Sequence, residues 1–303
     1  MTPIKILLFG KGGQVGWELQ RSLAPLGELV ALNTGSQDLC GDFTNLEGIA
    51  QTIRAVAPDI IVNSAAYTAV DKAESEAELA RIINALAPGV LAQEAKRSGA
   101  WLVHYSTDYI FDGSGDTPWL ETDTTGPLSI YGKTKLEGEE LIRASGSQHL
   151  IFRTSWVYAA RGANFAKTML RLARERDQLA VINDQIGAPT GADLLADITA
   201  HAIRTAMQRP DVSGLYHLVA GGQTSWHGYA SFVIEYARLA GIDIKVSPEA
   251  IQPVPTNAFP LPAPRPKNSR LDTHKLQDTF GLTLPHWQSG VIRMLTEILE
   301  KQQ

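Results

Sequence analysis

Over the first two thirds of the chain, short apolar runs alternate with longer segments in which apolar residues recur every three or four positions. The short runs are typical of buried strands, and the longer period is typical of helices that bury one face. The predicted strands are 4–9, 28–33, 59–65, 101–106, 148–154 and 178–182. The predicted helices are 14–25, 45–57, 72–98, 128–145 and 164–176. This alternation predicts an α/β fold with a Rossmann-type, doubly wound parallel sheet.

The last third of the chain has a sparser pattern, which predicts a smaller C-terminal α/β substrate lobe. Its predicted elements are a helix at 193–208, a strand at 214–219, a helix at 225–240 and a terminal helix at 287–301. We therefore expect a dinucleotide-binding domain over residues 1–160, with 178–182 as a further core strand and later returns of the chain. Residues 161–303 would form mainly the substrate-binding lobe, with the chain crossing between the two.

A proline-rich segment interrupts the last third, with six prolines between residues 252 and 270. Proline has no backbone N–H and a fixed φ, so this segment is neither a helix nor an inner strand. Two interpretations remain: an ordered surface loop that helps to close a ligand cleft, or a plain linker.

Composition narrows the functional class. The 303 residues are 44% hydrophobic and 19% charged with a net charge of -5, which is ordinary for a soluble enzyme and argues against general nucleic-acid or membrane-surface binding. An anionic ligand would have to be met by individual Arg or Lys residues. The single cysteine, Cys40, fits a reducing compartment, and the apolar N-terminal run is too short for a signal segment. We expect a cytoplasmic protein.

A glycine-rich turn follows the first predicted strand and opens the first predicted helix. Gly10, Gly13 and Gly16 are spaced three residues apart. Glycine permits a tight turn, close approach of the backbone to a pyrophosphate, and close packing of helix on strand. The helix start then offers unpaired N–H groups to phosphates. The context of strand, turn and helix predicts a dinucleotide cofactor.

Asn33 ends the second predicted strand, where such folds often carry an acidic residue that binds the adenosine ribose. An amide can bond a 2'-hydroxyl and does not repel a 2'-phosphate, so NADPH and NADH both remain open. Lys11 either favours binding of the 2'-phosphate of NADPH or is a solvated charge of the loop. Asp42 and Phe43 could hold the adenine, although Asp42 could instead cap the next helix. The small residues from Asn63 to Ala66 would let a cofactor approach the strand ends, or form a close-packed turn.

Tyr131 and Lys135 lie four residues apart and therefore on one face of a predicted helix. Reduction of a ketone needs a proton donor at the carbonyl oxygen, and a phenol has an ordinary pKa of about 10. An ammonium within about 4–6 Å would lower that pKa, and its remaining donors could bind a nicotinamide ribose. Thr107, at the end of another strand, offers a hydroxyl to the same oxygen. Each residue alone has an ordinary packing or surface role, but together with the glycine turn they indicate a reductase.

These residues resemble the extended short-chain dehydrogenases/reductases, and within them the dTDP-4-dehydrorhamnose reductase family. The resemblance extends over nearly the whole chain. The segments that carry it are 10–16, 65–74, 106–111, 131–135, 153–158, 184–190 and 265–269. It implies reduction of a 4-keto sugar nucleotide to dTDP-β-L-rhamnose with NADPH or NADH, the last step of dTDP-L-rhamnose biosynthesis, and rhamnose for lipopolysaccharide O-antigen or another surface glycan.

The resemblance also implies roles for individual residues. The catalytic residues would be Tyr131, Lys135 and Thr107. Tyr131 and Lys135 would also contact the cofactor. The other cofactor-binding residues would be Gly10, Gly13, Gln14, Val15, Gly16, Asn33, Asp42, Phe43, Ala65, Ala66, Tyr67 and Thr68. The substrate would be bound by Thr107, Asp108 and Trp156, and Val70 could line the same pocket. Arg265 is added as a substrate residue from its charge and position alone. An indole face suits a 6-deoxysugar, although Trp156 could be a buried strand aromatic. Arg265 or Arg270 of the proline-rich segment could bind the diphosphate.

Some members of this family are described as Mg²⁺-linked homodimers, and Glu18, Asp193 and Glu297 match that pattern. Scattered carboxylates of this kind are otherwise solvated surface charges. Two other functions stay open. An NDP-sugar epimerase or dehydratase shares the fold and the Tyr/Lys pair but keeps its cofactor bound through each cycle. A non-catalytic nucleotide-binding subunit, as in methionine adenosyltransferase, would not need Thr107, Tyr131 and Lys135.

Overall fold

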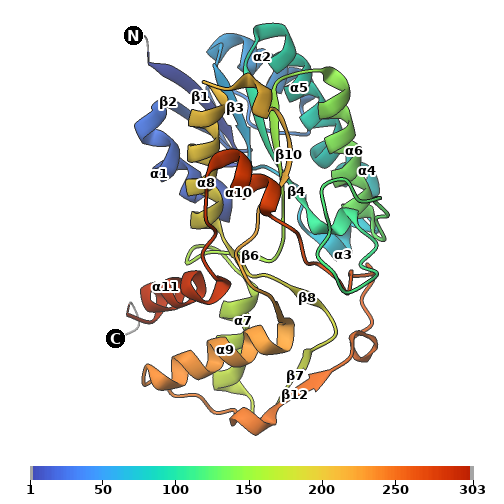
Figure 1. Ribbon diagram of the computed structural model, residues 1–303, viewed down its shortest axis with the longest axis vertical. Coiled ribbons are helices and arrows are strands. Elements are labelled where there is room, and N and C mark those ends of the chain that lie inside the picture. The colour runs from blue at the N-terminus through green and yellow to red at the C-terminus, as the bar shows by residue number, and fades with distance from the viewer. Residues whose placement is uncertain (1–2, 301–303) are drawn as a thin grey trace.

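Six parallel strands form the upper part of the molecule in the order β10-β5-β4-β3-β1-β2 (Figure 1). The computed structural model describes residues 3–300. The strands are β1 (Ile4–Phe9), β2 (Gly27–Leu32), β3 (Ile60–Asn63), β4 (Trp101–Thr107), β5 (His149–Thr154) and β10 (Gly214–His217). The predicted doubly wound parallel sheet is confirmed. β2 is added on one side of β1, and β3 and the later strands are added on the other side. Ligands of such folds bind at the carboxyl ends of the strands beside this change of side.

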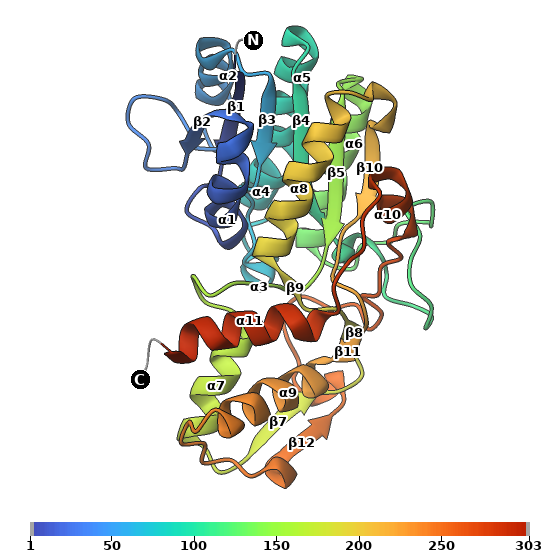
Figure 2. The ribbon, with the colours of Figure 1, turned by 60° about the vertical axis from the view of Figure 1, so that its left-hand side comes forward.

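Helices cover both faces of the sheet, as Figure 2 shows. One face packs against α1 (Gln14–Leu23), α8 (Ala192–Ala206) and α10 (His274–Phe280). The other packs against α2 (Leu46–Val56), α5 (Ala87–Ser98) and α6 (Ile130–Ser145). Because the sheet is buried on both faces, its strands are almost continuously apolar, which is why their pattern stands out in the sequence.

The second lobe lies beyond the carboxyl ends of the strands (Figure 2). It contains the helices α7 (Phe165–Glu175), α9 (Trp226–Leu239) and α11 (Trp287–Glu300), joined by buried apolar side chains. Its strand pairs are β6 (Val157–Tyr158) with β9 (Thr190–Gly191), β7 (Leu179–Ile182) with β12 (Ile251–Val254), and β8 (Ile186–Gly187) with β11 (Thr224–Ser225). The lobe is therefore helical with small strand pairs. Residue 301 of the predicted terminal helix lies outside the described residues.

The predicted strand at 178–182 is present, but it is not part of the six-stranded sheet. As β7 it pairs with β12 in the second lobe, and β10 takes the sixth place in the large sheet. A four-residue apolar strand does not specify its partner, because pairing depends on segments distant in the sequence. The core-strand assignment was wrong, whereas the expected return of the chain to the first domain is what β10 provides.

Two other predicted elements differ in detail. The continuous helix at 72–98 is divided into α3 (Val70–Ala73), α4 (Ala77–Arg81), a π-helical turn (Ile82–Leu86) and α5. Pro88 has no N–H for the carbonyl four residues before it, and the π-helical turn directly precedes it. In the proline-rich segment, residues 251–254 form β12, which has one partner strand, so proline is tolerated there.

Short 3-10 helices complete the described elements. They are η1 (Ala24–Leu26), η3 (Asp108–Ile110), η4 (Pro210–Val212), η5 (Pro248–Ala250) and η6 (Thr256–Ala258). None of the helices between residues 3 and 300 is both long and apolar enough to cross a membrane.

Candidate active site

The glycine turn has the geometry that a phosphate-binding loop needs. Gly10 has a φ of +87°, and a Cβ at Gly16 would lie 2.0 Å from the Gly10 carbonyl oxygen, so both positions require glycine. Gly13 is the N-cap of α1, and no side chain caps the helix there. A Cβ at Gly13 would make only ordinary contacts. The uncapped N–H groups of α1 therefore fit a dinucleotide pyrophosphate.

This turn opens onto a cavity of about 430 Å³ at the carboxyl ends of β3, β4 and β5. The cavity brings together residues from six separate segments of the chain. Its lining residues are Gly13, Gln14, Val15, Ser64, Ala66, Thr68, Val70, Tyr105, Ser106, Thr107, Asp108, Tyr109, Tyr131, Lys135, Thr154, Ser155, Trp156, Val157 and Trp226. The structure thus places all three predicted catalytic residues in one cavity with the predicted cofactor loop. A few convergent polar groups in such a cavity are typical of an active site.

Tyr131 is held at the start of α6. Ser129 caps this helix by accepting a hydrogen bond from the Gly132 N–H at 3.2 Å, which places Tyr131 in the first turn. Its ring packs edge-on against Tyr109, with centroids 5.7 Å apart. Burial raises the pKa of Tyr131 to about 12, against the opposing effect of a hydrogen bond with Thr107. The phenol therefore keeps its proton at neutral pH and lies beside the predicted partner hydroxyl.

Lys135 lies one helical turn from Tyr131, as its spacing predicted, but its amine contacts partners in β4. Its Nζ lies 2.5 Å from the Tyr105 carbonyl oxygen, to which it donates, and 3.2 Å from His104 Nε2. Burial lowers the pKa of Lys135 to about 8, against the opposing charge of Glu139. Burial dominates the environment of both groups, and the lowering of the Tyr131 pKa by a Lys135 ammonium stays a prediction.

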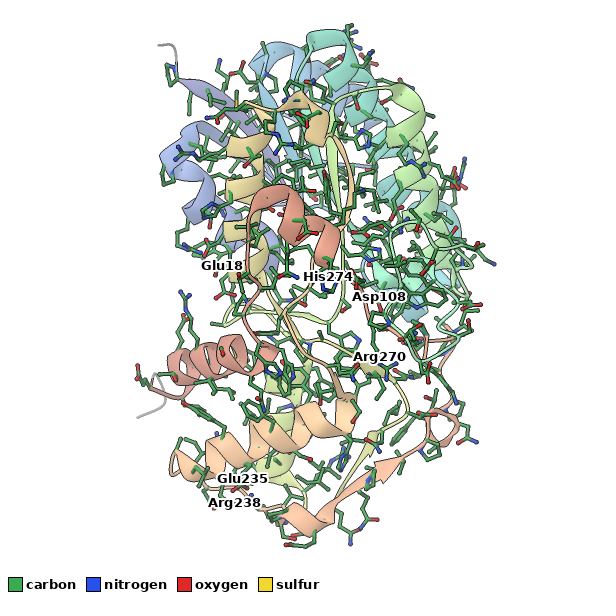
Figure 3. The ribbon with its side chains drawn as sticks, viewed as in Figure 1. Glu18, Asp108, Glu235, Arg238, Arg270 and His274 are labelled. Atoms are coloured by element: carbon green, nitrogen blue, oxygen red, sulfur yellow. The ribbon has the colours of Figure 1, made fainter. Side chains whose placement is uncertain are left out.

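Asp108 and Trp156 give the cavity its distinctive chemistry. Asp108 is buried at the end of β4, where desolvation raises its carboxyl pKa to about 6. Figure 3 marks it near the boundary between the sheet and the second lobe. Trp156 has a φ of +50°, an uncommon backbone conformation for a bulky residue that is often found at functional sites. Its indole stacks on Trp226 with centroids 3.6 Å apart, so the second lobe covers one face of this ring.

The predicted adenine residues lie away from the cavity lining. Asp42 accepts hydrogen bonds from the Thr44 N–H and hydroxyl, and Asn45 is the N-cap of α2, so the alternative that Asp42 caps this helix is wrong. Phe43 is buried in the core with its ring edge-on to Phe9. Asn33 accepts hydrogen bonds from the Gly35 N–H and the Ser36 hydroxyl. Their cofactor roles stay predictions, as does that of Ala65.

Asn84, which the sequence analysis missed, binds the backbone of Tyr67 in the second segment predicted to contact the cofactor, residues 65–68. Its Oδ1 accepts the Tyr67 N–H at 2.8 Å, and its Nδ2 donates to the Tyr67 carbonyl and the Thr134 hydroxyl. The Tyr67 phenol turns away to donate to Glu76, which raises its pKa to about 12. Asn84 therefore fastens Tyr67 to α6. The sequence carried no signal for this role, because Asn84 lies inside the predicted continuous helix at 72–98.

Two buried hydroxyls point to ligand contacts that were also missed. Ser106 Oγ and Thr154 Oγ1 line the cavity and have no hydrogen-bond partner within residues 3–300. Buried hydroxyls are rarely left unpaired in folded proteins, so these two are candidates for contact with cofactor or substrate. Ser106 and Thr154 lie within the last two residues of apolar strands, and this position was the signal that the sequence offered.

Arg265 and Arg270 are already engaged within the chain. Arg265 forms a two-point ion pair with Asp71 at 2.5 and 2.7 Å. It also interacts with Tyr109, which lines the cavity, so the proline-rich segment does reach the edge of the site. Arg270 donates to the side chains of Gln223 and Asn268. The segment therefore packs at the edge of the cavity without lining it, and its role in closing the cleft stays a prediction.

Glu18, Asp193 and Glu297 line one small hollow of about 50 Å³ together with Arg293. Asp193 pairs with Arg293 at 3.5 Å. Among the described residues, no three acidic, histidine or cysteine side chains lie close enough to hold a metal ion. The residues of one chain therefore do not fit a Mg²⁺ site by themselves, and the metal and the homodimer stay predictions.

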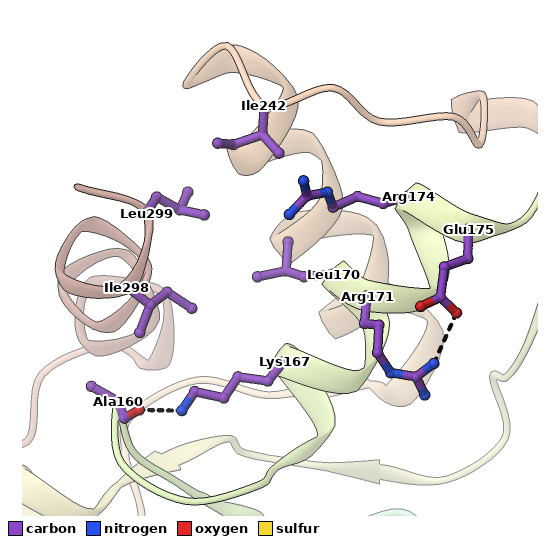
Figure 4. A pocket seen from close by; sticks show the side chains of 9 residues that line it. All are labelled: Ala160, Lys167, Leu170, Arg171, Arg174, Glu175, Ile242, Ile298 and Leu299. Carbon is purple, nitrogen blue, oxygen red and sulfur yellow. Dashed lines mark hydrogen bonds and ion pairs between the residues drawn. The ribbon is translucent and has the colours of Figure 1, made fainter. Parts of the chain in front are cut away.

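A larger hollow of about 520 Å³ lies between α7 and α11 and shares no residue with the candidate site (Figure 4). Its cationic side chains are turned to partners in the chain. Arg171 pairs with Glu175 at 2.8 Å, and Lys167 donates to the Ala160 carbonyl. The hollow is otherwise lined by apolar side chains such as Leu170 and Ile298. It therefore lacks the convergent polar groups of the cavity beside Tyr131.

Comparison with known proteins agrees with this geometry. The family described as RmlD substrate binding domain matches residues 4–300. A dTDP-4-dehydrorhamnose reductase of Escherichia coli (strain K12) is 63% identical over 295 residues, covering 97% of this chain and 98% of that protein. One of Shigella flexneri is 62% identical over 295 residues with the same coverage. The crystal structure of a dTDP-4-dehydrorhamnose reductase from Bacillus anthracis in complex with NADP has a TM-score of 0.86 at 34% identity, covering 98% of this chain and 100% of that one.

Proposed function

The chain belongs to the RmlD substrate binding domain family, and from this premise we propose that it reduces the 4-keto group of dTDP-4-dehydro-β-L-rhamnose to dTDP-β-L-rhamnose. This is the last step of dTDP-L-rhamnose biosynthesis. The observation that carries the proposal is the convergence of Gly13, Thr107, Tyr131 and Lys135 on one cavity. NADPH or NADH supplies the hydride when bound.

Tyr131 donates the proton in this reaction. Its pKa of about 12 keeps the phenol protonated until negative charge develops on the substrate oxygen. Thr107 Oγ1 accepts the Tyr109 N–H at 3.1 Å and donates its single hydroxyl proton to Asp108 Oδ1 at 3.0 Å, at the end of β4 beside the phenol. When substrate is bound, this proton turns to the reacting oxygen and helps to stabilise its negative charge.

Lys135 and the cofactor loop orient the reactants. Lys135 lies one helical turn beyond Tyr131 and lines the same cavity, so its amine can reach the ribose of a nicotinamide nucleotide. The α1 N-terminus with Gly13, Gln14 and Val15 binds the pyrophosphate. Trp156 and Val70 provide the apolar wall that suits a 6-deoxysugar, and Asp108 faces its hydroxyl groups. Arg265 is proposed for the diphosphate, with Asp71 holding its guanidinium.

A direct assay tests this function. Purified protein is mixed with dTDP-4-dehydro-L-rhamnose and each reduced nicotinamide, and oxidation is followed at the nicotinamide absorbance. We expect turnover with at least one nucleotide and release of cofactor on dilution, since a reductase exchanges it in each cycle. Failure to oxidise either nucleotide would contradict the proposal. Cofactor that stays bound through gel filtration would favour an epimerase or dehydratase.

Replacement of Tyr131 by Phe separates catalysis from binding. The change removes the proton donor but keeps the ring and its packing on Tyr109. General acids contribute roughly 10²- to 10⁴-fold, so we expect kcat to fall by that range while the dissociation constant for NADPH stays within about twofold. Tyr236→Phe is the control, because this phenol bonds Thr296 outside the cavity and its loss should change kcat little. An unchanged kcat in Tyr131→Phe would show that Tyr131 is a packing residue.

A further inference from the structure

A buried histidine lies behind Lys135, outside the lining of the cavity. His104 is in β4 and is 1% exposed, and it is the register partner of Asn63 at the end of β3. Its Nδ1 lies 3.0 Å from Asn63 Nδ2, and its Nε2 lies 3.2 Å from Lys135 Nζ. These three polar side chains come from three segments and form a row beneath the catalytic helix.

The orientation of the Asn63 amide is set by the backbone. Asn63 Oδ1 accepts the Ala65 N–H at 3.0 Å, so the NH₂ group is the one that faces His104. An amide NH₂ can only donate a hydrogen bond. His104 Nδ1 must therefore accept, which leaves it without a proton.

The tautomer of His104 follows from this. A neutral imidazole carries one proton, so that proton is on Nε2, which faces Lys135. An ammonium has no lone pair and cannot accept from Nε2–H, whereas an uncharged amine accepts one hydrogen bond and can still donate. Lys135 also donates to the Tyr105 carbonyl at 2.5 Å. The pattern of donors and acceptors is complete only when the amine is uncharged.

We propose that Asn63 fixes the Nε2-protonated tautomer of His104, and that His104 is thereby a positioning residue that holds the Lys135 amine and favours its uncharged form. His104 touches neither the cavity nor its contents. It acts through Lys135, the group we propose to contact the nicotinamide ribose. Cofactor contacts would then compete with Nε2–H for the amine, and the protonation of Lys135 would depend on what the cavity holds.

The surrounding charges agree with this arrangement. Burial, the largest cause, holds the pKa of His104 well below its ordinary value, so the imidazole stays neutral. Glu139, one turn beyond Lys135, favours the ammonium, but it is bound at two points by the buried Arg153 of β5. Tyr131 on the same helix and Asp108 at the end of β4 are the other titratable groups of this region. Burial outweighs Glu139 and lowers the pKa of Lys135.

Nitrogen NMR of the unmodified protein tests the tautomer without any assumption about the reaction. The protein is labelled with ¹⁵N-histidine, and the His104 signals are assigned by their loss in His104→Gln. We expect the Nε2–H tautomer at every pH between 5 and 8, with no titration. A proton on Nδ1, or a cationic ring within this range, would overturn the proposal.

Asn63→Asp reverses the tautomer with almost no change of shape. A carboxylate still accepts the Ala65 N–H but requires a proton on His104 Nδ1, so Nε2 becomes an acceptor for a Lys135 ammonium. This arm rests on the proposed function. We take the Lys135 ammonium as the form that binds the ribose, so in the unmodified enzyme kcat/KM should fall as this proton is lost above about pH 8. In Asn63→Asp we expect that fall to move upward by one pH unit or more, and the NMR signal to report Nδ1–H. An unchanged pH profile together with Nε2–H in the variant would overturn the proposal.

The added negative charge alone could also raise the pKa of Lys135, so a double variant separates the two effects. Asn63→Asp with His104→Phe keeps the charge and removes the imidazole. The upward shift should disappear in this variant, and a shift of equal size would attribute it to charge and overturn the role of His104. If the double variant does not fold, the ¹⁵N spectrum of Asn63→Asp decides. If the unmodified enzyme does not reduce the sugar nucleotide, the proposed function fails while the tautomer result stands.

Discussion

Burial moves the pKa values of the cavity residues in directions that suit different tasks. Asp108 and Tyr131 are acids whose charged forms are disfavoured, so their pKa values rise to about 6 and about 12. Lys135 is a base whose charged form is disfavoured, so its pKa falls to about 8. Desolvation alone explains all three directions. Groups with perturbed pKa values in one cavity are a physical mark of an active site.

Asp108→Asn should stabilise the protein in a pH-dependent manner. The folded-state pKa of Asp108 is raised from 3.8 to about 6, so above pH 6 the folded protein bears a buried charge that the unfolded chain solvates freely. At about 1.4 kcal/mol per pKa unit, the free energy of unfolding at pH 7.5 should rise by about 1–3 kcal/mol. The gain should decline between pH 6 and 4 and vanish below 4, where both states are protonated. Urea unfolding at pH 7.5 and at pH 3.5 measures this, and an equal gain at both would contradict it.

Arg265→Ala tests the proposed diphosphate contact. Hydrogen bonds to charged groups contribute about 1.5–3 kcal/mol, so the KM for the sugar nucleotide should rise by roughly 10- to 100-fold while the KM for NADPH stays unchanged. Asp71→Asn is the matched control, since it weakens the ion pair but keeps the guanidinium. Steady-state kinetics measures both variants. Unchanged sugar-nucleotide binding in Arg265→Ala would remove this residue from the site.

At the scale of elements, the site depends on where strands end and helices begin. Thr107, Asn63 and Thr154 end β4, β3 and β5, so their side chains gather at one edge of the sheet. The glycine turn and the Ser129 cap start the two helices that meet them. Parallel strands place their carboxyl ends together, which explains why polar residues after apolar runs were informative.

Gly16→Ala should disrupt the contact between α1 and the cofactor turn. The added Cβ would lie 2.0 Å from the Gly10 carbonyl oxygen, and backbone must move to relieve it. Overpacking of this kind costs about 1–3 kcal/mol, and the displaced turn should weaken NADPH binding at least tenfold. Gly12→Ala is the control, because its Cβ would meet nothing closer than 3.8 Å. Thermal unfolding and nicotinamide fluorescence measure both, and wild-type behaviour of Gly16→Ala would refute the close-approach argument.

At the scale of the whole molecule, the two lobes share the chain and are not independent segments. The first 160 residues lack β10, which borders β5, and α8, which covers one face of the sheet. The second lobe in turn contributes Trp226 to the cavity and stacks it on Trp156. The active site is therefore complete only when the chain has crossed between the lobes more than once.

A fragment of residues 1–160 should fail to fold cooperatively. Without α8, the apolar side chains that pack against Leu195, Ile198 and Ile203 would be exposed, and β5 would become an open edge. We expect aggregation or a broad thermal transition by circular dichroism, with the full chain as the control. A sharp transition and dispersed NMR signals from the fragment would show that the first domain is autonomous.

The sequence by itself determined the features that depend on neighbours along the chain. Apolar periodicity specified most of the helices and strands. The glycine spacing and the Tyr131/Lys135 pair pointed to the turn and the helix that line the candidate site, because backbone sterics and helical spacing are local properties. Only the tertiary structure decided that β10 and not β7 completes the sheet, and that Lys135 turns toward His104. Those outcomes depend on contacts between segments distant in sequence and on burial, and neither strand pairing nor desolvation is encoded in any short stretch of residues.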